Sequence, residues 1–316
     1  MYIKKIGVFF AVMLGVVGCL QAPEANKPIK NIQSLSITST PHEIYKFTIA
    51  TGAARSDWYD EGKGLSAEIN AQSSNLLSNI KETESLMENV DLLTSGKAGL
   101  VFVYDFHVVF ANRGKLMDVF PDAPMEKIAI KCGTEMARPM FPDYAEAARI
   151  ILPLYEEHVL IVVPAESDVK SWNDLKGKRI SIGAVGSAIE QQARFIFTAL
   201  DMHGKDEISR ENFDLFPAIH ALQNGEIDAL LWSVHLPSKE VSDLLNSPDI
   251  KLKIIPINKD EEEMILQSVP GVFHKSRIPA GAFGSIPGDI DTLATTVVLA
   301  AMDDFPVDHA VQILTV

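Results

Sequence analysis

Segments that favour strands alternate with segments that favour helices along most of this chain. The strand-forming segments are 45–50, 100–104, 179–183, 227–232 and 251–257, and the helix-forming segments are 58–71, 82–95, 187–202 and 216–224. Three further segments have a clear pattern. Segment 149–163 contains two apolar runs separated by Pro153, segment 168–177 is typical of a polar helix and turn, and segment 292–302 is a long apolar run. Strands that alternate with helices are typical of parallel sheets covered on both faces. The sequence therefore predicts an α/β fold.

Composition sets the size of the core and removes one class of partner. The chain has 316 residues, of which 47% are hydrophobic, which is enough for about two domains with cores of their own. Its 42 acidic residues outnumber its 28 Lys and Arg residues, so the formal net charge is −14. Nucleic-acid binding requires a basic surface, and the sequence holds no dense cluster of Lys and Arg. Nucleic acid is therefore excluded as a partner.

The N-terminus has the features of an export signal. Lys4 and Lys5 precede an uncharged run from Ile6 to Val17, which is shorter than the roughly 20 residues of a membrane-spanning helix. We therefore expect 1–18 to be a signal peptide and the chain beyond it to be exported. Residues 19–44 are rich in Pro, Asn, Ser and Thr, which predicts a flexible segment before the folded part.

The end of this signal resembles the bacterial lipobox. Val16-Val17-Gly18-Cys19 places an aliphatic residue, a small residue and a cysteine in the order that the lipobox requires. The resemblance implies cleavage before Cys19, a diacylglycerol on its sulfur, and acyl chains that anchor the protein to the membrane. An ordinary signal peptide that happens to contain a cysteine is the alternative. Lipidation leaves Cys132 without a disulfide partner, and we expect it to be a small buried hydrophobic residue.

Motifs of enzymes and metal sites are absent from the sequence. It contains no G-x-S-x-G elbow, Walker loop, G-x-G-x-x-G or H-E-x-x-H motif, and its two cysteines form no cluster. The eight histidines never recur at helical spacing, so a zinc site has no support. We therefore expect no catalysed reaction, no cofactor and no metal.

Two turns of small residues follow predicted strands and precede predicted helices. One is 51–56, after the first strand, and the other is 183–188, where Ser187 is in position to cap the next helix. Ligands of open α/β sheets bind beyond the carboxyl ends of the strands, where backbone N–H groups and helix dipoles favour a carboxylate or phosphate. Because the two turns lie in separate halves of the chain, they predict a ligand held between two lobes.

The order of motifs resembles the TAXI family of solute receptors for TRAP transporters. Four segments carry the resemblance: 171–187 (SWNDLKGKRISIGAVGS), 154–156 (LYE), 221–229 (ALQNGEIDA) and 278–283 (IPAGAF). The D-L-K-G-K block also occurs in other type II periplasmic-binding proteins, and the Ile-Pro-Ala-Gly block indicates TAXI. The resemblance implies a two-lobed type II fold, each lobe a mostly parallel sheet flanked by helices. Lobe I would comprise 45–165 and 238–316, and lobe II 166–237.

The first loop departs from this family. Its glycine-rich pattern T-G-G-x-G-G-x-Y-Y is replaced by 51–59 (TGAARSDWY), where Ala53, Arg55 and Ser56 stand in place of glycines. A guanidinium at Arg55 can hold a carboxylate with two hydrogen bonds, and an exposed arginine at a loop tip is the alternative. Segment 111–149 has no counterpart in the family.

The resemblance and the two turns together indicate which residues contact the solute. From lobe I, hydrogen-bond donors would be Thr51, Gly52, Ala53 and Arg55, a wall of the cleft would be formed by Trp58 and Tyr59, and further hydrogen bonds would come from Asn89 and Tyr104. From lobe II, the solute would be capped by Gly186, Ser187 and Ala188. Trp232 would lie on the strand that leads to the hinge. Packing in the core is the alternative for Tyr104 and Trp232.

The expected function is therefore capture of a small solute outside the cytoplasm. The resemblance implies that the solute is an amino acid or an organic acid with a carboxylate. The lobes would close on the solute, and the protein would deliver it to a TRAP-type integral membrane subunit. A degenerate receptor that acts as a ligand sensor for a membrane signalling partner is the alternative.

Overall fold

A computed structural model describes residues 43–54, 56–111, 147–202, 207–248, 251–284 and 288–316. The strands are β1 (Tyr45–Ala50), β2 (Leu76–Lys81), β3 (Leu100–Tyr104), β4 (Ala148–Pro164), β5 (Arg179–Ser181), β6 (Ser209–Glu211), β7 (Ala229–Val234), β8 (Leu252–Ile254), β9 (His274–Ile278) and β10 (Ile290–Met302). The helices are α1 (Asp57–Gln72), α2 (Leu86–Thr94), α3 (Asp105–Ala111), the 3-10 helix η2 (Asn173–Leu175), α7 (Ala188–Ala199), α8 (Leu215–Gln223), α9 (Lys239–Leu245), α10 (Lys259–Ser268) and α11 (Val307–Ile313).

Several expectations fall on residues beyond these ranges. They are the signal peptide 1–18, Cys19 and the rest of the 19–44 segment up to residue 42, Arg55, Cys132, and residues 112–146 of the 111–149 segment. Among the described helices, none has both the length and the hydropathy needed to cross a bilayer.

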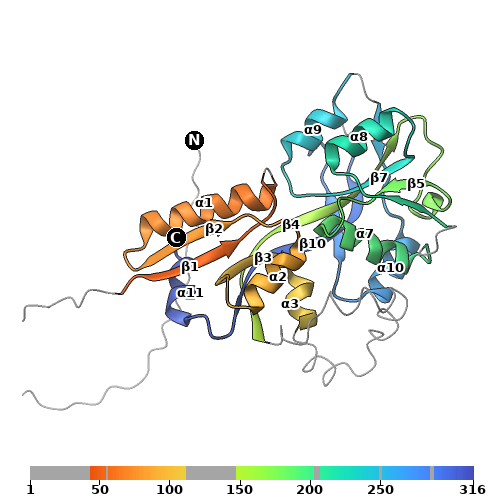
Figure 1. The fold of residues 1–316 in the computed structure, drawn as a ribbon. Coiled ribbons are helices and arrows are strands. Elements are labelled where there is room, and N and C mark those ends of the chain that lie inside the picture. Colours follow the sequence, from red (N-terminus) through yellow and green to blue (C-terminus); the bar gives the residue numbers. More distant parts are fainter. Residues whose placement is uncertain (1–42, 55, 112–146, 203–206, 249–250, 285–287) are drawn as a thin grey trace, which may run out of the picture. The chain divides into compact units, whose positions relative to one another are not determined.

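The sheet consists of two parallel groups of strands joined by two long antiparallel strands. Its order is β2-β1-β3-β10-β4-β7-β5-β6, with β8 beside β4 and β9 beside β10 (Figure 1). β1 is parallel to β2 and β3, and β5 is parallel to β6 and β7. β10 is antiparallel to β3 and β4, and β4 is antiparallel to β7. The expected α/β class, with a mostly parallel group of strands in each half and helices flanking the sheet, is confirmed.

Pro153 does not end the strand in which it lies. β4 continues through it from residue 148 to 164, because the pairing with β10 shifts at this point. Val297 pairs with Tyr155 and Val298 pairs with Pro153, so Leu154 is an extra residue that bulges from the ladder. Proline has no N–H to donate, and a bulge is one of the few places in a sheet that tolerates it. In segment 168–177, helical structure is confined to the three residues of η2.

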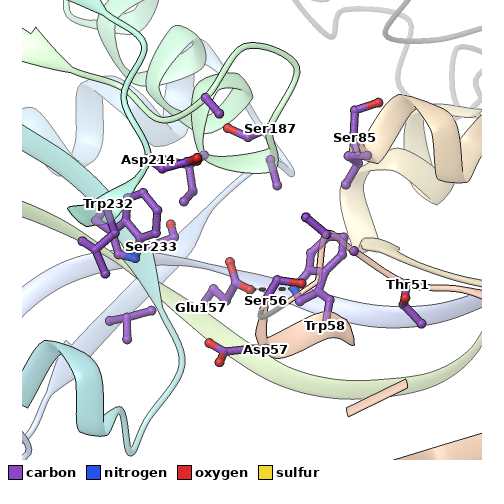
Figure 2. Close-up of a pocket in the computed structure, with 18 of the residues that line it drawn as sticks. Thr51, Ser56, Asp57, Trp58, Ser85, Glu157, Ser187, Asp214, Trp232 and Ser233 are labelled. Atoms are coloured by element: carbon purple, nitrogen blue, oxygen red, sulfur yellow. Dashed lines mark hydrogen bonds between the residues drawn. The ribbon is translucent and has the colours of Figure 1, made fainter. Parts of the chain in front are cut away.

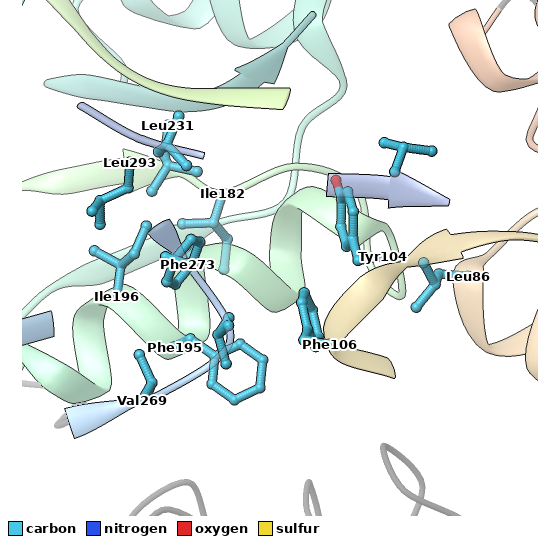
Figure 3. Packing of buried hydrophobic residues seen from close by; sticks show 14 of the residues in the cluster. Leu86, Tyr104, Phe106, Ile182, Phe195, Ile196, Leu231, Val269, Phe273 and Leu293 are labelled. Carbon is cyan, nitrogen blue, oxygen red and sulfur yellow. The ribbon is translucent and has the colours of Figure 1, made fainter. Parts of the chain in front are cut away.

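The main core packs α3 and α7 against the long strands. Phe106 of α3 and Phe195 of α7 are almost fully buried and meet edge to face, with ring centroids 5.7 Å apart (Figure 3). On the same two helices, the imidazole Nε2 of His107 lies 2.9 Å from Oε1 of Gln191. The apolar face of α7 therefore packs both against α3, which follows the first parallel group of strands, and against the long strands of the sheet.

A second apolar cluster bears on where the lobes divide. Val241, Ile278 and Phe283 are buried together with Ile219 of α8 and Leu230 of β7. The division of the chain into 45–165 with 238–316, and 166–237, stays a prediction. This packing favours a division in which the stretch from Val241 to Phe283 accompanies the second strand group.

We predict that truncating Phe195 destabilises the protein far more than truncating an exposed phenylalanine. Phe195→Ala removes a ring that is 1% exposed and leaves a cavity, which costs about 3–5 kcal/mol. Phe216→Ala is the matched control, because Phe216 is 64% exposed, and it should change stability by less than about 0.5 kcal/mol. Urea unfolding followed by circular dichroism measures both, and equal losses would contradict this description of the core.

The protein should also lose stability between pH 6.5 and pH 4 because of His107. Burial lowers the pKa of His107 from 6.5 to about 4, so the unfolded chain takes up a proton before the folded chain does. The unfolding free energy is unaffected by this titration above the pKa of the unfolded state, 6.5. As the pH falls from there toward 4, the unfolding free energy decreases by at most about 3 kcal/mol. The measurement is the unfolding free energy of the wild type minus that of His107→Gln at several pH values. A difference that does not change with pH would contradict the prediction.

Candidate functional site

A cavity of about 270 Å³ lies between the two parallel strand groups (Figure 2). It is lined by Thr51, Gly52, Ala53, Ser56, Asp57, Trp58, Thr83, Glu84, Ser85, Leu86 and Tyr104 of the first half, by Glu157 of β4, and by Ala184, Ser187, Ala188, Ile189, Asp214, Leu215, Trp232, Ser233, Val234, Ser238 and Val241 of the second half. Its volume is just below the roughly 300–1,000 Å³ of pockets for drug-sized ligands, which suits a small metabolite.

The loop from β1 to α1 forms one wall of this cavity. Thr51 is fully buried, and its hydroxyl donates to the carbonyl oxygen of Lys81 at 3.1 Å, so the hydroxyl is already engaged within the protein. A Cβ at Gly52 would lie 2.6 Å from Oγ of Ser56, so a larger residue here would displace the serine that caps α1. Ser56 caps α1 by accepting a hydrogen bond from the Tyr59 N–H.

Asn89 holds this loop in place from behind. It is fully buried, and its Nδ2 donates to the carbonyl oxygens of Thr51 at 2.6 Å and of Phe102 at 2.9 Å. Ser85, four residues earlier, caps α2 by accepting from the Glu88 N–H at 3.1 Å and lines the cavity. The structure therefore places Asn89 behind the cavity wall rather than in it.

The loop from β5 to α7 forms the opposite wall. Gly183 has a φ of +85°, and a Cβ there would lie 2.9 Å from Oγ of Ser187, so this position needs glycine. Ser187 caps α7 by accepting from the Glu190 N–H at 3.1 Å, which confirms the predicted cap. The Gly186 N–H donates to Oε2 of Glu190 at 2.6 Å and is therefore not free for a solute.

Of the described helices, five begin at the cavity. The residues that precede α1, α2, α7, α8 and α9 are Ser56, Ser85, Ser187, Asp214 and Ser238, and all five line it. Helix N-termini carry a partial positive charge and unpaired backbone N–H groups. Their convergence therefore favours a negatively charged group of a solute.

A buried carboxylate also lines the cavity. Glu157 lies on β4 and is 8% exposed; its Oε1 accepts from the indole N–H of Trp58 at 2.8 Å and its Oε2 from the hydroxyl of Tyr104 at 2.6 Å. Burial raises the pKa of Glu157, and these two hydrogen bonds offset part of that rise. Figure 2 shows Glu157 between the indole rings of Trp58 and Trp232.

One ion pair joins the two halves beside the cavity. Nδ1 of His235, which follows β7, lies 3.1 Å from the carboxylate of Asp57 at the start of α1. This contact raises the pKa of His235, and burial opposes the rise. The ring of Tyr155 on β4 lies 5.1 Å from the imidazole. A charge on His235 is therefore balanced by Asp57.

The structure brings together most of the residues expected to contact a solute. Thr51, Gly52, Ala53, Trp58, Tyr104, Ser187, Ala188 and Trp232 line the cavity, Tyr59, Asn89 and Gly186 do not, and Arg55 lies outside the described residues. Direct contact with a solute stays a prediction for each of them.

The sequence did not predict the four acidic residues of the lining as part of the site. They are Asp57, Glu84, Glu157 and Asp214. No sequence signal separates Glu157 from a surface acid. The Ser85 cap was also missed, although Ser85 and Glu88 stand at the spacing of a capping box, which predicts the start of α2. Among the described lining residues there is no Lys, Arg or His, and no group of acids, histidines and cysteines in the described chain is arranged to hold a metal.

Solved structures of similar proteins are distant in sequence. The probable amino-acid ABC transporter extracellular-binding protein ytmK from Bacillus subtilis is 14% identical, with a TM-score of 0.47 over 86% of this chain and 91% of that one. The arginine-bound, truncated ArgBP from T. maritima is 12% identical, with a TM-score of 0.44 over 85% and 93%. The putative periplasmic sulfonate-binding protein SsuA from Methylobacillus flagellatus is 16% identical, with a TM-score of 0.44 over 87% and 67%.

The family match covers the second part of the chain. Residues 140–315 match the NMT1-like family, and this range is more than half of the 316 residues. It includes β4 with Glu157, the loop with Ser187, and β7 with Trp232. The chain belongs to the NMT1-like family.

Proposed function

We propose that this protein is an extracytoplasmic receptor that captures a small carboxylate-bearing solute between its two strand groups. The observation that carries the proposal is the cavity at which five described helices begin, two from the first half of the chain and three from the second. The starts of α1 and α2 line the cavity from the first half and those of α7 and α8 from the second, so a carboxylate bound there would lie near helix N-termini of both halves. A solute that contacts both halves favours the closed arrangement over an open one.

The contacts of Glu157 support binding without catalysis. Among the described residues it accepts from the indole of Trp58 and the hydroxyl of Tyr104 rather than from a serine, threonine or cysteine. Four of the five serines in the lining cap helices by accepting a backbone N–H, and the fifth, Ser233, donates to Gln192. The four caps are Ser56, Ser85, Ser187 and Ser238. The function proposed is therefore binding rather than chemistry.

Delivery to a TRAP-type membrane subunit completes the proposal. It rests on the sequence blocks 171–187 and 278–283, which resemble TAXI receptors. The lipobox-like ending at Cys19 supports export and attachment to a membrane by acyl chains. In this account the tether keeps the receptor close to its transporter.

A thermal-shift screen tests the proposal. The full chain in mild detergent is heated with the protein amino acids, 2-oxo acids and dicarboxylates, each added singly. A ligand at 100 times its dissociation constant should stabilise the fold by about 2.7 kcal/mol and raise the melting midpoint. Ser187→Trp should abolish the shift, because an indole at this position fills the cavity that Ser187 lines.

The control for this screen is Ser209→Trp. Ser209 is exposed on β6 and is not part of the cavity lining, so the same substitution there should leave the shift intact. If no solute of the panel shifts the wild type, or if both variants retain the shift, the proposed function is contradicted.

A further inference from the structure

Among the residues that the structure describes, Glu157 is a carboxylate without an ion-pair partner. It is 8% exposed, and the two side chains that donate hydrogen bonds to it, those of Trp58 and Tyr104, are neutral. The imidazole of His235 interacts electrostatically with Glu157, but it is paired with Asp57 at 3.1 Å. A buried charge without an ionic partner is costly, so such a group is retained where a ligand completes its environment.

Glu157 lines the cavity, and each of its oxygens accepts a single hydrogen bond from the described residues. Oε1 accepts one hydrogen bond from Trp58 and Oε2 accepts one from Tyr104, whereas a carboxylate oxygen has two lone pairs. The two donors fix the orientation of the carboxylate, since both come from fully or almost fully buried rings. Glu157 is thus oriented by the protein and open to one further donor on each oxygen.

The other acids of the lining have a simpler explanation. Asp57 is the first residue of α1 and Asp214 precedes α8, and a carboxylate at a helix N-terminus is favourable without any ligand. Glu84 is exposed. Glu157 lies on a strand, opposite Thr295 of β10, so no helix terminus accounts for it.

The rings around Glu157 point to the same ligand chemistry. Trp58, Tyr104 and Trp232 line the cavity, and Trp58 meets Tyr104 edge to face at 5.4 Å. Aromatic faces attract cations such as ammonium groups, and the attraction is stronger where water is excluded. The described lining contains no Lys, Arg or His that would repel a cation.

We infer that Glu157 accepts hydrogen bonds from a positively charged amino group of the solute. Combined with the helix N-termini, which favour a carboxylate, this makes the solute a zwitterionic amino acid rather than a simple organic acid. The ammonium lies at Glu157, between the aromatic rings, and the carboxylate lies at the start of the helices. The inference rests on the proposed solute-binding function and deepens it, so its test must separate the two.

Titration calorimetry on the full chain in mild detergent provides that test. The probes are the amino acid that gives the largest thermal shift and its 2-oxo acid, which keeps the carboxylate and side chain but lacks the amino group. The wild type should bind the amino acid at least about tenfold more tightly. Glu157→Gln should weaken binding of the amino acid roughly thirtyfold or more and change binding of the 2-oxo acid less than about threefold.

Glu157→Gln should also keep its fold. Its amide oxygen can accept from Trp58 and its amide nitrogen can donate to the oxygen of Tyr104, so both contacts persist. Because burial raises the pKa of Glu157, a neutral side chain there should leave the melting midpoint of the unliganded protein at neutral pH unchanged or higher. A purely structural glutamate would instead lower the midpoint without discriminating between the two probes.

The matched control is Glu261→Gln. Glu261 is fully buried, accepts hydrogen bonds from Asn173, and is not part of the cavity lining. This variant should bind both probes with wild-type affinity. Equal loss of both probes in Glu157→Gln, or a wild type that binds only 2-oxo acids or dicarboxylates, overturns the inference but leaves solute binding intact. A wild type that binds no member of the thermal-shift panel contradicts the proposed function and the inference with it.

Discussion

The antiparallel pairing of β4 with β10 is the constraint on which the rest of the structure depends. β10 is hydrogen-bonded to β3 of the first parallel group, and β4 is hydrogen-bonded to β7 of the second. On β4 the pairing with β10 extends from Ala148 to His158, and the pairing with β7 extends from His158 to Val162. Because a slip of one residue would turn every side chain of a strand to the other face, this register fixes which residues are buried in both halves. Glu157 lies one residue before the change of partner, which is why it is placed between the two groups.

The cavity combines two opposite electrostatic demands, and a zwitterion meets both. Helices that begin at the carboxyl ends of parallel strands present backbone N–H groups, which favour a negative charge. Glu157, held by Trp58 and Tyr104, is a buried negative charge that favours a positive one. Without a solute, the folded protein retains the cost of burying this carboxylate. Binding of an ammonium group would offset that cost, so part of the binding free energy would come from a deficit built into the unliganded fold.

Local signals in the sequence predicted the fold class but not the chemistry of the cavity. β1 and β3 agree with the predicted 45–50 and 100–104 because their β-forming residues are consecutive, and Ser187 was identified because helix caps depend on nearby residues. β2 was not predicted, because its buried position Ser78 is a polar residue satisfied by hydrogen bonds to Ser66. Glu157 could not be predicted either. A glutamate beside an apolar run is normally an exposed residue, and its burial depends on partners 99 and 53 residues away.

A crystal structure of the protein with the amino acid that stabilises it most would test the role of Glu157 most directly. We expect the ammonium nitrogen to lie about 2.7–3.2 Å from an oxygen of Glu157. We also expect the solute carboxylate to accept backbone hydrogen bonds at the start of α7 or α1, with Trp58 and Trp232 beside the ligand. A ligand whose ammonium group is solvated or bound elsewhere, with Glu157 contacting only Trp58 and Tyr104, would contradict this role.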